Sequence, residues 1–156
     1  MKQFVHFFFF NLFLFLSISA KAQCLSGGIT FSTQAQIDNF ATNYPGCHKI
    51  LGDVNISGSD ITNVDGLNSL YTVGGNLQIN GNNILNNING LSALISISGY
   101  FSIQNNSALK DLNGINALTS IAGDLTIKNN ALTTINGLNA LASIAGDLYL
   151  QNNSAL

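Results

Sequence analysis

The sequence repeats itself with a period of 23 or 24 residues, and this period constrains the fold more than any other feature. Each unit opens with a glycine that is followed by a polar residue, an apolar residue, any residue and a second apolar residue. This glycine occurs at Gly52, Gly75, Gly99, Gly123 and Gly146. Two apolar columns stay in phase with it, namely Val54, Leu77, Phe101, Leu125 and Leu148, then Ile56, Ile79, Ile103, Ile127 and Leu150. A unit of this length cannot bury its apolar side alone, so we expect the units to stack around one continuous core.

The second half of each unit adds another glycine column and further apolar columns. The second glycine is found at Gly66, Gly90, Gly114 and Gly137. Apolar residues recur two apart in GDLTIKNN and three apart in LNALASI, which predicts an alternating strand, then turns, then a shorter extended piece. Glycine and asparagine interrupt the units too often for a long helix. The pattern predicts an all-β solenoid, either a right-handed parallel β-helix of 23–24-residue leucine-rich coils or a leucine-rich solenoid.

Residues 1–22 have the three zones of a secretory signal peptide. Lys2 supplies the charged start, an apolar stretch follows, and small residues precede a cleavage site after Ala22. The apolar stretch is shorter than the ~20 residues of a transmembrane helix. We therefore expect no transmembrane segment and a protein that is secreted or held at the cell surface. Lipidation of Cys24 is the alternative, but Gln23 precedes it where such signals carry Gly, Ala or Ser.

The charge composition excludes several classes of ligand and most catalytic chemistry. The chain contains no Arg, Glu or Trp, and beyond residue 22 it keeps three Lys against seven Asp, a net charge of −4 with His neutral. Three cations cannot neutralise a run of phosphates, so we expect no nucleic-acid partner and no adhesion to acidic membranes. Because few groups suited to acid, base or nucleophilic chemistry remain, we expect no enzymatic activity and no cofactor.

The only two cysteines, Cys24 and Cys47, lie near the start of the exported chain. Outside the cytosol a pair of thiols normally becomes a disulfide, so we expect this pair to be bonded. The chain-entropy model gives such a loop roughly 3 kcal/mol of stabilisation. A metal site or a reactive thiol is the alternative, but His48 is the only other ligand nearby, and we predict no metal site.

Residues 23–46 are expected to form a small N-terminal cap, followed by the repeats over residues 47–156. GGITFST is typical of a short strand, and Ser32 or Thr33 can cap a helix that runs through about Ala41. This helix would place three apolar residues on one face, namely Ile37, Phe40 and Ala41. The cap would cover apolar columns and strand edges that the first unit otherwise exposes.

The order of these elements resembles a receptor L domain, the ligand-binding β-helix of insulin-type and epidermal-growth-factor-type receptors. The resemblance rests on the first cysteine, the short strand, the cap helix and CHKILGDVNI with its phased units. Later units such as LTSIAGDLTIKNN are still more similar to secreted bacterial and fungal proteins with L-domain-like leucine-rich repeats. The resemblance implies an exported surface or secreted protein whose ligand is unknown. It does not imply receptor signalling, because the sequence has no Cys-rich module, transmembrane segment or kinase.

Two carboxylates on neighbouring units form the first candidate site. Asp124 and Asp147 each follow the repeating glycine, which predicts a separation of about 5 Å on adjacent strands. Such a pair can hold Ca²⁺ or act as an acid and a base. The alternative is a Gly-Asp turn whose side chain binds its own backbone. We favour the turn, because Asn76 and Tyr100 interrupt the column and no Arg or His stands nearby.

Paired asparagines mark the same turn in successive units, at Asn82, Asn83, Asn105, Asn106, Asn129, Asn130, Asn152 and Asn153. Inward amides that stack unit on unit can bind the backbone of the turn, as in leucine-rich repeats and amide ladders. Recognition of sugar hydroxyls is the alternative. The structural role is favoured, because the asparagines occur wherever the chain must turn.

The outward positions of the main strand form the last candidate. One column contains Asn55, Gln78, Ser102, Thr126 and Tyr149, and the next contains Ser57, Asn80, Gln104, Lys128 and Gln151. Solenoids commonly bind ligands on an extended sheet surface. We therefore predict a binding surface for a protein or carbohydrate that includes Gln78, Ser102, Thr126, Lys128, Tyr149 and Gln151. The alternative for this surface is a solvated face that binds no ligand. The alternatives for the protein are a structural spacer of a larger surface protein and a β-helix enzyme that acts on polysaccharides.

The last unit stops early. Leu156 occupies the column of Leu109 and Leu132, so the unit lacks its second glycine and the segment after it. Such an ending would leave apolar columns and a strand edge exposed to water. We therefore expect that the chain is a fragment and that further units and a C-terminal cap follow.

Overall fold

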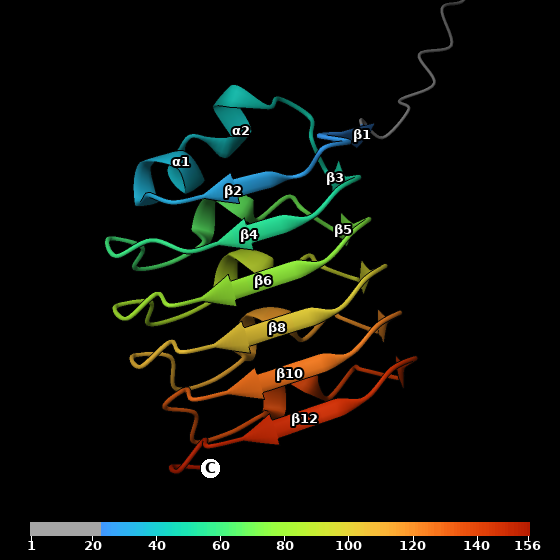
Figure 1. Ribbon diagram of the computed structural model, residues 1–156. Coiled ribbons are helices and arrows are strands. Elements are labelled where there is room, and N and C mark those ends of the chain that lie inside the picture. Colours follow the sequence, from blue (N-terminus) through green and yellow to red (C-terminus); the bar gives the residue numbers. More distant parts are fainter. Residues whose placement is uncertain (1–22) are drawn as a thin grey trace, which may run out of the picture.

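The computed structural model describes residues 23–156, which form two parallel six-stranded sheets (Figure 1). The signal peptide expected over residues 1–22 lies outside the described residues. The strands of one sheet, called the long sheet, are β2 (Ile29–Phe31), β4 (Val54–Ile56), β6 (Leu77–Asn80), β8 (Phe101–Gln104), β10 (Leu125–Lys128) and β12 (Leu148–Gln151). The strands of the other, the short sheet, are β1 (Gln23–Cys24), β3 (Lys49–Ile50), β5 (Thr72–Val73), β7 (Ser96–Ile97), β9 (Ser120–Ile121) and β11 (Ser143–Ile144).

The register of the long sheet confirms the alignment of the repeats. Leu77 pairs with Phe101, Phe101 pairs with Leu125, and Leu125 pairs with Leu148. In the short sheet, Val73 pairs with Ile97 in the same way. Residues one period apart therefore lie side by side, and each apolar column of the sequence becomes a continuous row across a sheet.

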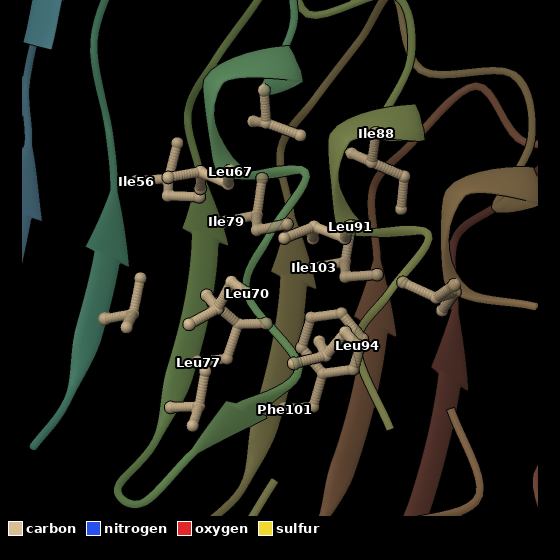
Figure 2. Packing of buried hydrophobic residues seen from close by; sticks show 14 of the residues in the cluster. Ile56, Leu67, Leu70, Leu77, Ile79, Ile88, Leu91, Leu94, Phe101 and Ile103 are labelled. Atoms are coloured by element: carbon tan, nitrogen blue, oxygen red, sulfur yellow. The ribbon is translucent and has the colours of Figure 1, made fainter. Parts of the chain in front are cut away.

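The core fills the space between the long sheet and the second half of each repeat (Figure 2). Leu77 and Ile79 from β6 point toward Leu67 and Leu70, which come from the segment between β4 and β5. All four side chains are completely buried. Because every repeat contributes the same rows, the core has no break along the stack.

Four short 3₁₀ helices lie between the long and short strands, and the sequence did not predict them. They are η1 (Asp65–Leu67), η2 (Asn89–Leu91), η3 (Asn113–Ile115) and η4 (Asn136–Leu138). Each contains the second glycine of its repeat. A Cβ on Gly114 would lie 1.8 Å from the carbonyl oxygen of Ile88, and one on Gly90 would lie 1.8 Å from that of Val64. The glycine is therefore required because consecutive 3₁₀ helices stack backbone against backbone.

The N-terminal cap contains two short helices, α1 (Gln34–Asp38) and α2 (Phe40–Asn43). Thr33 caps α1 and forms a capping box with Gln36, which confirms one of the two predicted caps. The single helix that we expected is interrupted at Asn39, whose main-chain N–H and side-chain Nδ2 both donate to the carbonyl of Ala35.

The interruption changes which residues the cap buries. Ile37 and Phe40 are completely buried as predicted, and Phe40 makes an edge contact with Phe31 at 5.7 Å between ring centroids. The prediction for Ala41 is wrong, because the new helix that begins at Phe40 turns Ala41 toward solvent.

The predicted disulfide between Cys24 and Cys47 is present, with 5.7 Å between the two Cα atoms. It links β1, the first strand of the short sheet, to the segment that enters β3. The cap is therefore covalently attached to the first repeat.

The two ends of the stack differ in how the apolar rows finish. At the β2 end the cap covers them. At the β12 end three leucines of those rows are exposed, namely Leu148, Leu150 and Leu156. No helix within residues 23–156 is long and apolar enough to cross a membrane.

Candidate ligand-binding face

The surface of the long sheet that points away from the core, called the outer face, carries all the predicted binding residues. In its first column Gln78 pairs with Ser102, Ser102 with Thr126, and Thr126 with Tyr149. In its second column Lys128 pairs with Gln151. The alternation of the strands thus gathers residues from four repeats, β6 to β12, into one polar patch.

Ser102 is much less accessible than the sequence pattern suggests. Its side chain points outward, but only 7% of the residue is exposed. Gln104, two residues further along β8, donates a hydrogen bond from Nε2 to Ser102 Oγ at 2.7 Å. Ser102 therefore lies in the floor of the outer face, and its hydroxyl is already engaged.

The column after the first glycine links neighbouring repeats through hydrogen bonds. Asp53 Oδ1 accepts the main-chain N–H of Asn76 at 2.7 Å, and Asn76 Oδ1 accepts that of Tyr100 at 2.9 Å. Asp124 Oδ1 accepts the N–H of Asp147 at 2.8 Å. The structural interpretation of these carboxylates is supported, but the expected partner was wrong. Each side chain binds the backbone of the next repeat rather than its own.

Tyr100 interrupts this column and was not predicted as a binding residue. It stands where the other four repeats carry Asp or Asn, and it is 36% exposed. Its phenol oxygen accepts a hydrogen bond from Gln78 Nε2 at 2.5 Å, which holds the side chain over the outer face. The sequence could have indicated Tyr100, because it is the one position in this column without the Asp or Asn that binds the backbone of the next repeat in other units.

Tyr149 is the second exposed tyrosine of the outer face, with 41% of its surface accessible. Its phenol donates a hydrogen bond to Asp147 Oδ2 at 3.0 Å. This hydrogen bond, together with the negative charges of Asp147 and Asp124, raises the pKa of the Tyr149 phenol above its ordinary value near 10. The tyrosine is thus protonated and tethered at neutral pH.

The turn asparagines serve the fold, as the sequence analysis favoured. The inward members form a buried ladder in which Nδ2 of Asn106 donates to the carbonyl of Ile79 at 2.9 Å, and Nδ2 of Asn130 donates to that of Ile103 at 2.9 Å. Each Oδ1 accepts the main-chain N–H of the asparagine one repeat earlier, as Asn130 does for Asn106 at 3.0 Å. Their amides are occupied by the protein itself.

The outer members of the asparagine pairs form a second ladder at the surface. Nδ2 of Asn105 donates to Asn80 Oδ1 at 2.9 Å, and Nδ2 of Asn129 donates to Asn105 Oδ1 at 2.9 Å. Asn105 and Asn129 have φ of 56° and 54°, in the left-handed region that asparagine tolerates better than most residues. The pairs Asn105–Asn106 and Asn129–Asn130 therefore combine a buried hydrogen-bonded amide with one at the surface. In the preceding turn Gly81 stands at the position of Asn105, so the predicted pairing of Asn82 with Asn83 does not fit the register.

Among residues 23–156 no three His, Cys, Asp or Glu side chains are grouped to share an ion. Asp124 and Asp147, the two carboxylates considered as calcium ligands, each accept a hydrogen bond from within the protein with one carboxylate oxygen.

Comparison of the chain with protein-family models, with curated proteins and with solved structures finds no match. The candidate site therefore has to be judged on its own chemistry.

Proposed function

We propose that this protein is an exported, noncatalytic repeat domain that binds a protein or carbohydrate ligand on the outer face of the long sheet. The observation that carries the proposal is Tyr100. Other repeats have Asp or Asn at this position, and Asp53 and Asp124 bind the backbone of the next repeat. This repeat has an exposed tyrosine there, whose phenol oxygen is hydrogen-bonded to Gln78. Departures from a local structural rule without a gain in stability are typical of functional sites.

Export is supported by two features at the start of the chain. Residues 1–22 have the pattern of a signal peptide, and Cys24 and Cys47 form a disulfide, a bond that persists in oxidising compartments. Mass spectrometry of protein recovered outside the producing cell is expected to give a chain that begins at Gln23 and is two hydrogens lighter than the reduced form. A chain that keeps residues 1–22 and two free thiols would contradict export.

We also propose that the two sheets belong to a closed right-handed parallel β-helix of the receptor L-domain kind. Support comes from the strict alternation of long and short strands along the chain and from the single period that governs both sheets. A crystal structure in which each repeat completes a turn of the opposite hand would contradict it.

Binding is best tested with one charged substitution in the middle of the outer face. Thr126 lies between Ser102 and Tyr149 and is partly exposed, so Thr126→Asp should fold and yet disturb a ligand. The matched control is Thr119→Asp, a change at an exposed position outside the long sheet. On arrays of glycans and of extracellular proteins, the parent and the control are expected to bind the same ligand and Thr126→Asp to lose it. Equal binding by all three would place the ligand elsewhere.

A structural spacer is the second candidate, and the ladders of side-chain hydrogen bonds favour it. They link consecutive repeats at the turn and before the long strand, which makes the stack stiff along its axis. A spacer predicts that no array ligand is retained and that Tyr100→Ala has no effect on the surface protein that contains the domain.

A further inference from the structure

We propose that the ligand is an uncharged polysaccharide of pyranose sugars, which lies across the outer face with one ring against Tyr100 and another against Tyr149. The inference rests on the proposed binding function and specifies its ligand. Both tyrosines are exposed, and both occupy columns that are filled by small or polar residues in the other repeats.

The relative position of the two tyrosines follows from the register of the sheet. Tyr100 precedes Phe101, which pairs with Leu125, and Leu125 pairs with Leu148, the residue before Tyr149. The two Cα atoms are thus separated by two strand spacings across the sheet and two residues along it, a distance of about 12 Å. A short oligosaccharide in extended form can reach both.

The surface between the tyrosines is polar. It is formed by Thr126 and by Gln104, which donates a hydrogen bond to the hydroxyl of the almost fully buried Ser102. Ser102 and Thr126 have short side chains, whereas the two tyrosines are large and exposed. Gln104, whose Nε2 already donates to Ser102, and Gln151 end the strands β8 and β12, and their side-chain amides suit the hydroxyl groups at the edge of a sugar ring.

The hydrogen bonds of the phenols prepare the rings for stacking. Gln78 engages the oxygen of Tyr100 and Asp147 engages that of Tyr149, so each side chain loses little freedom when a ligand arrives. A pyranose ring carries C–H groups on its faces, and these suit the electron-rich face of an aromatic ring. Tyrosine also supplies a large contact area with few rotatable bonds.

The charges near the site select against acidic ligands. Asp124 and Asp147 are exposed at the edge of the outer face, and Lys128 is the one cation among its predicted binding residues. A uronate or sulfated polysaccharide would be repelled by the two carboxylates, whereas a neutral polysaccharide is not. The face therefore fits neutral glycans better than acidic ones.

The test uses hexasaccharides of a β-1,4-glucan, a β-1,3-glucan, a xylan and a mannan, with an oligogalacturonate as the acidic counterpart. The disulfide-bonded protein contains no Trp, so tyrosine fluorescence reports binding, and calorimetry gives the affinity. At least one neutral hexasaccharide is expected to bind. Tyr100→Ala and Tyr149→Ala should each weaken it about tenfold, by the energy of one aromatic contact.

Two control variants make the result specific. Tyr71→Phe changes a tyrosine that stacks on His48 away from the outer face and should bind as the parent does. Tyr149→Phe keeps the ring and loses the tether, so its affinity should fall between those of the parent and Tyr149→Ala. Thermal unfolding at the parent's midpoint would show that each variant is folded.

Several outcomes would overturn the inference. They are the absence of binding by every neutral hexasaccharide at millimolar concentration, a preference for the oligogalacturonate, or equal affinity in the two alanine variants and the parent. If no glycan binds but a protein ligand is lost in Thr126→Asp, the inference is wrong and the proposed function stands. If Thr126→Asp affects no ligand at all, the proposed function fails as well.

Discussion

The main-chain N–H of Asn106 donates a hydrogen bond to Oδ1 of Asn130, the equivalent residue of the next repeat, at 3.0 Å. The Asn106 side chain in turn accepts the N–H of Asn82 at 3.1 Å. Asn106 therefore joins its own turn to the turns on both sides, through its main-chain N–H and its side chain. A buried polar network of this kind is stabilising only while each member keeps its partners.

Asn106→Ala should destabilise the protein by about 3 kcal/mol, because it leaves the buried N–H of Asn82 without its acceptor and removes the amide that donates to the carbonyl of Ile79. Asn116→Ala is the matched control, since Asn116 is exposed in a helical conformation and should change the free energy of unfolding by less than about 0.5 kcal/mol. Urea unfolding followed by circular dichroism measures both. Similar midpoints would show that the ladder contributes little.

Gly114→Ala should cost about 3 kcal/mol or more, because the new Cβ would lie 1.8 Å from the carbonyl oxygen of Ile88 and would force η2 and η3 apart. Gly27→Ala has open space around it and should be nearly neutral. Thermal unfolding of the two variants checks this difference. An unchanged midpoint for Gly114→Ala would contradict the backbone contact.

Leu125→Asp should unfold the protein or lower its melting temperature severely, because it places a carboxylate in a completely buried position of β10. Thr126→Asp, one residue further along the strand, should be mild, because that side chain points toward solvent. Differential scanning calorimetry compares them. Equal losses of stability would mean that the inward and outward positions are wrongly assigned.

Tyr149 should ionise at higher pH than an ordinary tyrosine. Because its pKa is raised in the folded state, the hydrogen bond to Asp147 is intact below pH 10 and is lost as the pH rises through the higher folded value. The difference in ultraviolet absorbance between the parent and Tyr149→Phe isolates this group. Asp147→Asn should bring the titration back toward 10, and an unchanged curve would argue against the contact.

Loss of the disulfide should destabilise the protein by roughly 3 kcal/mol, as expected for a loop closed by residues 23 apart. The variant Cys24→Ser, Cys47→Ser avoids free thiols and should unfold at lower urea concentration than the parent. Reduction of the parent should have the same effect. A parent whose unfolding is insensitive to reduction would contradict the structural role of the bond.

The parallel pairing of the repeats could be predicted because the register is set by a period that the sequence displays directly. Leu77, Phe101 and Leu125 fall in one column of the alignment and in one row of the sheet. The 3₁₀ helices could not be predicted, because a helix of three residues such as η3 is too short to produce a helical pattern of apolar residues in the sequence. Gly114 marked the place without revealing the backbone contact that requires it.

The candidate site was less predictable than the fold. The outward columns followed from alternation, but the burial of Ser102 depends on how Gln104 folds over it. Tyr100 differs from its column because Asp53 and Asn76 bind the backbone of the following repeat, whereas its own side chain does not. Such contacts between repeats depend on side-chain geometry, which an alignment of the repeats does not give.

Each repeat contributes one strand to each sheet, and this arrangement determines how the protein would respond to force. The hydrogen bonds between strands run along the stack, and β2 and β12 lie at its opposite ends (Figure 1). A force that pulls these ends apart would open one row at a time, and each released repeat would lengthen the chain by about 80 Å. The loop between Cys24 and Cys47 would stay closed under that force, so the cap would add almost no length until the bond is reduced.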